Sequence, residues 1–190
     1  MKKTIATMSA AALLLAAAST YAQTAAPAAP AAAAPAAPAA PAKPKAGDML
    51  PEFTVMGYPG EAPVDGKTLI GKATATAIVF FNTGCSSCLA ELTEASVALK
   101  AVNDPTKLLV YAVAVDKRGA KSVEMYEESY KFGVNYFLDP DFKLPPKFGF
   151  RYTPAMVVVD KTGRITEIKG GFDPVAEKGS VQKLLMEAAK

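Results

Sequence analysis

The sequence contains no histidine and no tryptophan, and it has only two cysteines, Cys85 and Cys88. Because a structural zinc site takes four cysteine or histidine ligands, this chain alone does not supply a complete set. Neither sign of charge is in large excess, because 21 basic residues against 18 acidic ones leave a net charge of +3. That balance does not indicate nucleic acid or an anionic membrane as a ligand. We therefore expect no bound metal and no other cofactor.

Long hydrophobic runs are also missing, apart from a short one near the N-terminus. Residues 1–22 combine Lys2 and Lys3, an apolar run to Ala18, and small residues up to Ala22. This order predicts a secretory signal peptide that is cleaved after Ala22. The apolar run is shorter than the 18 or more residues of a membrane span, so an uncleaved anchor is the weaker alternative. We expect a periplasmic or secreted protein, tethered to the membrane if the signal stays uncleaved.

Residues 23–45 follow with 13 alanines and 6 prolines. Recurrent proline interrupts any alanine helix and the segment lacks residues for a core, which predicts a disordered linker. Residues 46–190 remain as one domain, long enough to bury a sizeable core.

The two cysteines form the motif Cys85-Ser-Ser-Cys88, where an apolar run at 77–82 gives way to a helical pattern at 86–102. Residues three apart share one face of a helix, at a separation that a disulfide can bridge. The unpaired amides of the helix start stabilise a thiolate on Cys85, which predicts that Cys85 is the nucleophile. Cys88, expected to be more buried, would act second and attack the mixed disulfide to release the reduced partner. The alternative is a static structural disulfide. We consider this alternative weaker, because closing so short a loop stabilises the fold by only about 2 kcal/mol.

The remaining pattern alternates strands with helices and ends in a hairpin and a last helix. Together these elements predict an α/β fold with a mixed central sheet, helices on both faces and a hairpin-like N-terminal extension. The expected strands cover 77–82, 108–115, 134–138, 154–160 and 164–169, and the expected helices cover 86–102, 120–132 and a segment starting at Asp173-Pro174. The N-terminal extension is expected to cover 47–53 and 67–70. Residues 141–149 are expected to be irregular because of Pro145-Pro146.

Two segments carry a resemblance to a known family: Phe80-Phe-Asn-Thr-Gly-Cys-Ser-Ser-Cys-Leu-Ala-Glu91, and Phe148-Gly-Phe-Arg-Tyr-Thr-Pro-Ala-Met-Val-Val-Val-Asp160. Over roughly 47–188 the chain resembles the thioredoxin-like fold and, more narrowly, the secreted TlpA/ResA-like redoxins. The resemblance implies a thiol-disulfide oxidoreductase in which Pro154 is cis and faces the dithiol. It also implies that Thr153 presents its main chain to an extended substrate, next to the residues around the nucleophile, Gly84, Ser86 and Ser87.

The chain departs from this family at several positions. Gly84 stands where most relatives have tryptophan, and Val79 stands where thioredoxins proper have a buried aspartate. The nearest candidate for a proton acceptor of Cys88 is Glu91, one helical turn further on. The alternative is that Glu91 is simply solvated on an amphipathic helix. Tyr152 is expected either near the dithiol or in ordinary rim packing.

Ser86 and Ser87 place no cationic imidazole between the cysteines, which favours a reducing couple. We thus expect an exported reductase that acts, as a monomer, on disulfide-bearing envelope proteins and takes electrons from a membrane thiol donor. Apocytochrome c maturation is one task of the resembled family, and the sequence does not single it out.

Three alternative functions fit the sequence less well. A thiol peroxidase is disfavoured because Ile78 and Asn82 stand where peroxiredoxins carry the proline and threonine of their P-x-x-x-[TS]-x-x-C pattern. Copper delivery resembling that of the Sco proteins is disfavoured, because it requires a histidine and this chain has none. A non-catalytic binding module with a permanent disulfide is the other alternative.

Overall fold

The computed structural model describes residues 43–190. The signal peptide predicted over 1–22 lies outside the described residues, as does the predicted linker except for its last three positions. Among residues 43–190, none of the helices has both the length and the apolar character that a membrane crossing requires.

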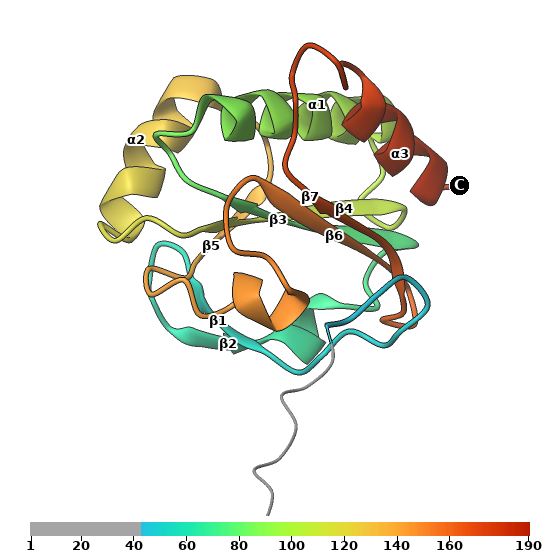
Figure 1. Ribbon diagram of the computed structural model, residues 1–190, viewed down its shortest axis with the longest axis horizontal. Coiled ribbons are helices and arrows are strands. Elements are labelled where there is room, and N and C mark those ends of the chain that lie inside the picture. The colour runs from blue at the N-terminus through green and yellow to red at the C-terminus, as the bar shows by residue number, and fades with distance from the viewer. Residues whose placement is uncertain (1–42) are drawn as a thin grey trace, which may run out of the picture. The chain divides into compact units, whose positions relative to one another are not determined.

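A single mixed sheet of seven strands organises the described part of the chain, in the order β2-β1-β5-β4-β3-β6-β7 (Figure 1). The three inner strands β3, β4 and β5 run parallel, whereas β6, β7 and the N-terminal hairpin β1-β2 pair antiparallel. A hairpin extension is present as predicted and adds to the sheet beside β5, but its strands are Thr54–Gly57 and Pro63–Asp65 and not the predicted segments 47–53 and 67–70. The strands are β1 Thr54–Gly57, β2 Pro63–Asp65, β3 Ala75–Phe81, β4 Leu108–Ala114, β5 Asn135–Leu138, β6 Ala155–Asp160 and β7 Ile165–Gly170.

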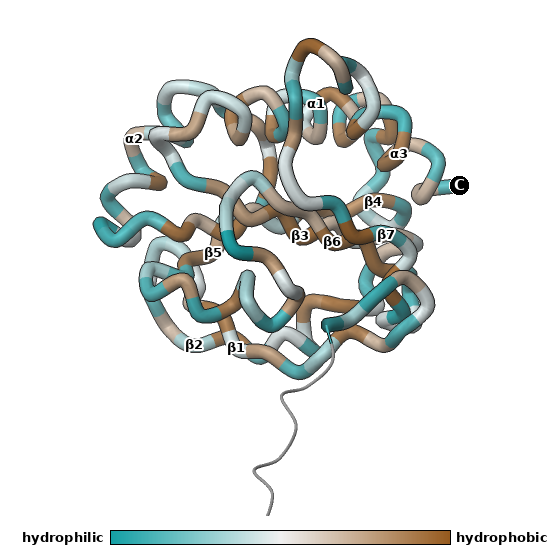
Figure 2. Tube along the Cα trace, viewed as in Figure 1, coloured by the Kyte–Doolittle hydropathy of each residue, from teal (hydrophilic) through white to brown (hydrophobic). Residues whose placement is uncertain are grey.

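The central strands are buried on both faces, which explains why their sequences are continuous apolar runs without polar alternation. Figure 2 shows the hydrophobic residues concentrated along β3 and β6. Every residue of β3 is buried, and β4 is buried except at Leu109. This burial fixes the two parallel strands that lead into the site described below.

Different kinds of helix cover the two faces of the sheet. The α-helices α1 (Ser86–Val102), α2 (Ala120–Tyr130) and α3 (Ser180–Ala188) pack on one face (Figure 1). The second face is covered by two short 3₁₀-helices, η1 (Gly66–Leu69) and η2 (Pro145–Phe148), over a core rich in phenylalanine. The expected mixed sheet with helices on both faces is thus confirmed.

Two expected elements differ in the N-terminal and proline-rich segments. Residues 67–70 do not form a strand, because the Asp65 carboxylate accepts the Lys67 N–H and caps the 3₁₀ turn η1. Pro145-Pro146 does not prevent a helical turn either. Proline lacks an N–H, but the first helical positions do not need one, and so both prolines fit at the start of η2.

The last helix begins later than its sequence predicts. Asp173 does cap a turn, since its side chain accepts the N–H groups of Val175 and Ala176 at 2.8 and 3.0 Å. However, Gly179 then adopts a left-handed conformation with φ 79°, and α3 starts only at Ser180. The glycine separates the capped turn from the helix.

Candidate active site

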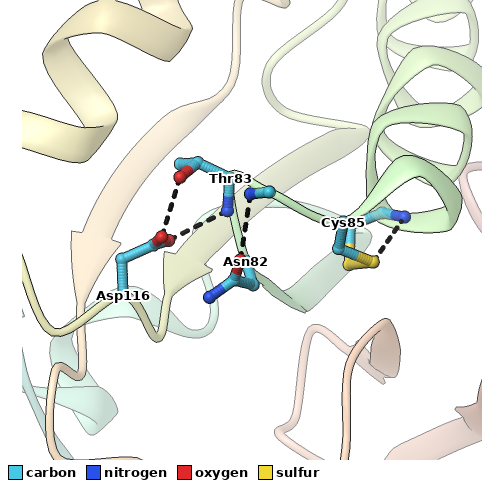
Figure 3. The surroundings of a disulfide bond; sticks show 6 residues. Asn82, Thr83, Cys85 and Asp116 are labelled. Atoms are coloured by element: carbon cyan, nitrogen blue, oxygen red, sulfur yellow. Dashed lines mark hydrogen bonds between the residues drawn. A yellow bond between two sulfur atoms is a disulfide. The ribbon is translucent and has the colours of Figure 1, made fainter.

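The connection from β3 to α1 holds the cysteine motif at the edge where the parallel strands β3 and β4 both end. The Thr83 N–H and hydroxyl donate to the two carboxylate oxygens of Asp116, at 2.9 and 2.7 Å (Figure 3). Asp116 is buried and follows directly after β4 and Val115. The Gly84 N–H donates to Asn82 Oδ1 at 2.9 Å. These hydrogen bonds fix the backbone immediately before Cys85.

Cys85 and Cys88 form a disulfide with their Cα atoms 5.2 Å apart. Cys85 is the N-cap residue of α1, and its Sγ accepts the Cys88 N–H at 3.1 Å. The two sulfurs differ in access: Cys85 is half-buried, whereas Cys88 is 0% exposed. An external thiol or disulfide can therefore reach Cys85, and the helix start stabilises negative charge on that same sulfur.

A cleft opens beside Cys85. Its wall includes Thr153, and the Thr153–Pro154 peptide bond is cis, as expected. Pro154 itself is buried, and its carbonyl accepts the Gly171 N–H at 2.8 Å. Tyr152, 62% exposed, also lines the cleft. The lining residues are Asn82, Gly84, Cys85, Val115, Lys117, Arg118, Pro140, Asp141, Phe142, Tyr152 and Thr153.

Glu91 is fully buried, so the alternative of a solvated glutamate is wrong. Its side chain is 0% exposed, and neither carboxylate oxygen has a hydrogen-bond partner among the described residues. Burial disfavours the charged form and raises the pKa of Glu91 to about 8. The amphipathic pattern could not reveal this burial, because the spacing of residues within one helix does not show what packs on it from elsewhere in the chain.

Three charged groups surround Glu91. The half-buried Lys169 of β7 lowers the pKa of Glu91, whereas Glu177 and Glu94 raise it. Lys169 pairs in register with Met156, so it lies on the face of the sheet that α1 covers. Lys169 is also ion-paired with Glu177, whose negative charge shifts the pKa of Glu91 in the opposite direction.

The structure places the predicted site residues in three groups. Gly84, Cys85 and Thr153 line the cleft, while Cys88, Glu91 and Pro154 lie buried. Ser86 and Ser87 occupy the first turn of α1 and are not among the lining residues.

Sequence reasoning missed four positions: Asp116, Lys117, Arg118 and Phe142. Their placement after β4 and β5 is the signal that could have found them, because residues after parallel strands gather at one edge of a sheet.

Comparisons with known proteins now bear on this geometry. The family model described as AhpC/TSA matches residues 46–168, which is more than half of the chain. The chain belongs to the AhpC/TSA family. A comparison with curated proteins found no match.

Solved structures similar to this AhpC/TSA protein share its fold. The thioredoxin domain of a thiol-disulfide oxidoreductase from Bacteroides vulgatus is 20% identical, with a TM-score of 0.58 over 75% of this chain and 99% of that one. A thiol:disulfide interchange protein from Bacteroides sp. is 22% identical, with a TM-score of 0.57 over 74% and 90%. A secreted disulfide oxidoreductase of Mycobacterium tuberculosis is 18% identical, with a TM-score of 0.53 over 72% and 93%. The resemblance to thioredoxin-fold redoxins is confirmed.

Proposed function

We propose that this AhpC/TSA protein is an exported thiol-disulfide reductase whose working centre is the Cys85–Cys88 pair. The observation that carries the proposal is the asymmetry of the two sulfurs. One sulfur lies in an open cleft at a helix N-terminus, and the other is sealed beneath it. A permanent structural disulfide requires no difference in access between its sulfurs. A thiol-disulfide exchange in two steps does, because only the attacking sulfur has to reach the client.

In the reduced protein, the Cys85 thiolate attacks one sulfur of a client disulfide. A mixed disulfide forms, and the other client sulfur leaves as a thiolate. The Cys88 thiol then loses its proton and attacks Cys85 Sγ, which releases the second client sulfur. Two electrons pass to the client, and the chain is left with the Cys85–Cys88 disulfide that the structure contains. A thiol donor restores the dithiol by the reverse exchange.

Glu91 is our candidate for the group that takes the Cys88 proton. It lies one turn beyond Cys88 on α1, and both side chains are fully buried, out of reach of bulk water as a base. With a pKa of about 8, about a tenth of the Glu91 carboxyl is ionised at pH 7, and this ionised fraction is the base that takes the thiol proton. Val79, on the neighbouring strand β3, offers no such group.

The client side of the site is the cleft wall formed by Thr153, next to cis-Pro154. We propose that an extended client segment lies along this wall and presents its disulfide to Cys85, close to Gly84, Ser86 and Ser87. The clients are disulfide-bearing envelope proteins, with apocytochrome c as one candidate, and a membrane thiol supplies the electrons to the monomeric protein. Export rests on the signal peptide predicted for residues 1–22.

Insulin reduction by dithiothreitol tests the proposal. The chain should accelerate the precipitation of reduced insulin, and Cys85→Ser should abolish the acceleration because the attacking thiolate is gone. Cys88→Ser should abolish turnover as well but should hold clients as mixed disulfides on Cys85, visible after non-reducing electrophoresis. A chain that does not accelerate the reaction, or that captures clients through Cys88 instead, would contradict the assignment.

Peroxide reduction separates this function from the thiol peroxidase alternative. The side chain of Asn82 is engaged with the Gly84 N–H, and no threonine or serine stands at that position. With a dithiol donor, the chain should not consume hydrogen peroxide faster than the Cys85→Ser variant does.

A further inference from the structure

The cleft beside Cys85 carries two cations that the exchange reaction itself does not use. Lys117 and Arg118 are exposed, line the cleft, and form no ion pair within residues 43–190. The acidic lining residue Asp141 is paired with Lys143 at 2.5 Å. The free charge that faces the cleft is therefore positive.

The short turn that holds these cations is tied directly to the cysteine loop. The Gly119 N–H donates to the Asp116 carbonyl at 2.9 Å, so Lys117 and Arg118 form the tip of a tight turn. The side chain of the same Asp116 binds Thr83, two residues before Cys85. One buried carboxylate thus fixes the nucleophile's loop and the two cations relative to each other.

Two aromatic side chains complete the cleft. Tyr152 lies close to the backbone of Gly171, where an added Cβ would come within 3.7 Å of its ring, and it remains 62% exposed. Phe142 is half-buried and has a left-handed backbone with φ 54°, a conformation that bulky residues rarely adopt. Its loop is held by the Asp139 carboxylate, which accepts the N–H groups of Lys143 and Leu144 at 3.0 and 2.7 Å.

From this arrangement we infer that the cleft selects client segments that carry acidic side chains next to the reactive cysteine. The inference rests on the proposed function and names the class of substrate for it. Carboxylates of the client would lie against Lys117 and Arg118, while the apolar part of the segment packs on the two rings. Opposite charges mainly speed the encounter and fix its register, so the preference should appear in the rate of attack by Cys85.

Three model peptides test the inference. They share one cysteine, linked by a disulfide to the same small thiol, and differ only in two flanking residues, which are aspartate, serine or lysine. The full chain is reduced beforehand, and the rate constant for each peptide is measured in single-turnover experiments at low salt. We expect the aspartate peptide to react about tenfold faster than the serine peptide, with the lysine peptide the slowest, and we expect salt to narrow these differences.

A double variant, Lys117→Ala with Arg118→Ala, should bring the aspartate and serine peptides to nearly equal rates. The matched control is Lys161→Ala with Lys183→Ala, which removes the same charge from exposed positions outside the cleft and should retain the preference. Equal rates for all peptides with the unmodified chain, or a preference that survives in the Lys117→Ala, Arg118→Ala variant, would overturn this inference and leave the proposed function intact. If none of the peptides is reduced, the proposed function fails together with it.

Discussion

At the scale of single residues, the two cysteines and Glu91 illustrate what neighbouring structure adds to a motif. The spacing of Cys85 and Cys88 predicts a disulfide, and the structure contains it. The environment of Glu91 is different, because two of the charged groups that shift its pKa, Lys169 and Glu177, lie more than 70 residues further along the chain. No local pattern in the helix distinguishes a covered glutamate from a solvated one.

Glu91→Gln tests the burial through the pH dependence of stability. The pKa of Glu91 is about 8 in the folded chain against 4.5 for an unperturbed glutamate. Between these values the unfolded chain releases the proton while the folded chain keeps it, so stability falls as the pH rises through this window. The loss is on the order of 4 kcal/mol by pH 8. Because glutamine does not titrate, the variant should lack this component.

Urea denaturation at pH 5, 6, 7 and 8 measures the effect as a difference between proteins. Glu128→Gln on the exposed side of α2 is the matched control, and its stability should follow that of the unmodified chain at every pH. If Glu91→Gln showed the same pH dependence as Glu128→Gln, the carboxyl would not be held protonated by burial.

At the scale of elements, α1 supports α3 as well as the cysteines. The Glu94 carboxylate of α1 accepts the N–H groups of Gly179, Val181 and Gln182 at 2.5, 3.0 and 3.4 Å. It thereby caps the N-terminus of a helix that lacks a capping side chain of its own. A sequence pattern predicts caps from adjacent residues, so this cap between two helices could not be anticipated.

Glu94→Ala should destabilise the chain by about 1–2 kcal/mol, because it leaves these N–H groups without their acceptor. The denaturation midpoint in urea at pH 7 measures the loss. Glu128→Ala, also a helical glutamate but without such partners, should change stability by less than about 0.5 kcal/mol. Equal midpoints for the two variants would show that the cap does not stabilise α3.

At the scale of the whole molecule, the buried strands and α1 follow from the sequence, because apolar runs and helical spacing reflect burial directly. Two predictions were wrong in detail. The segment 141–149 was expected to be irregular but forms η2, because proline is tolerated at the start of a helical turn. The last helix was expected from Asp173-Pro174 but begins at Ser180, after Gly179 in a left-handed conformation. The cleft could not be predicted as a unit. Its walls come from the ends of β3, β4 and β5 and from the segment before β6, which only the folded sheet brings together.

The protein can exchange disulfides repeatedly only if the Cys85–Cys88 disulfide opens without unfolding the domain. α1 begins at the cysteines but is held along its length by the core formed with Leu92, Ala95 and Leu185. Breaking the sulfur–sulfur bond therefore leaves the helix packed. We expect the oxidised form to exceed the reduced form in stability by only about 2 kcal/mol, as a local four-residue loop implies.

Redox equilibrium in glutathione or dithiothreitol buffers, measured by alkylation and mass spectrometry, shows whether the Cys85–Cys88 pair is a working dithiol. We expect a reversible two-electron couple between Cys85 and Cys88 with a midpoint in the reducing range, on the order of −200 to −270 mV. A midpoint near the roughly −120 mV of strong oxidants, or a disulfide that opens only when the domain unfolds, would contradict it.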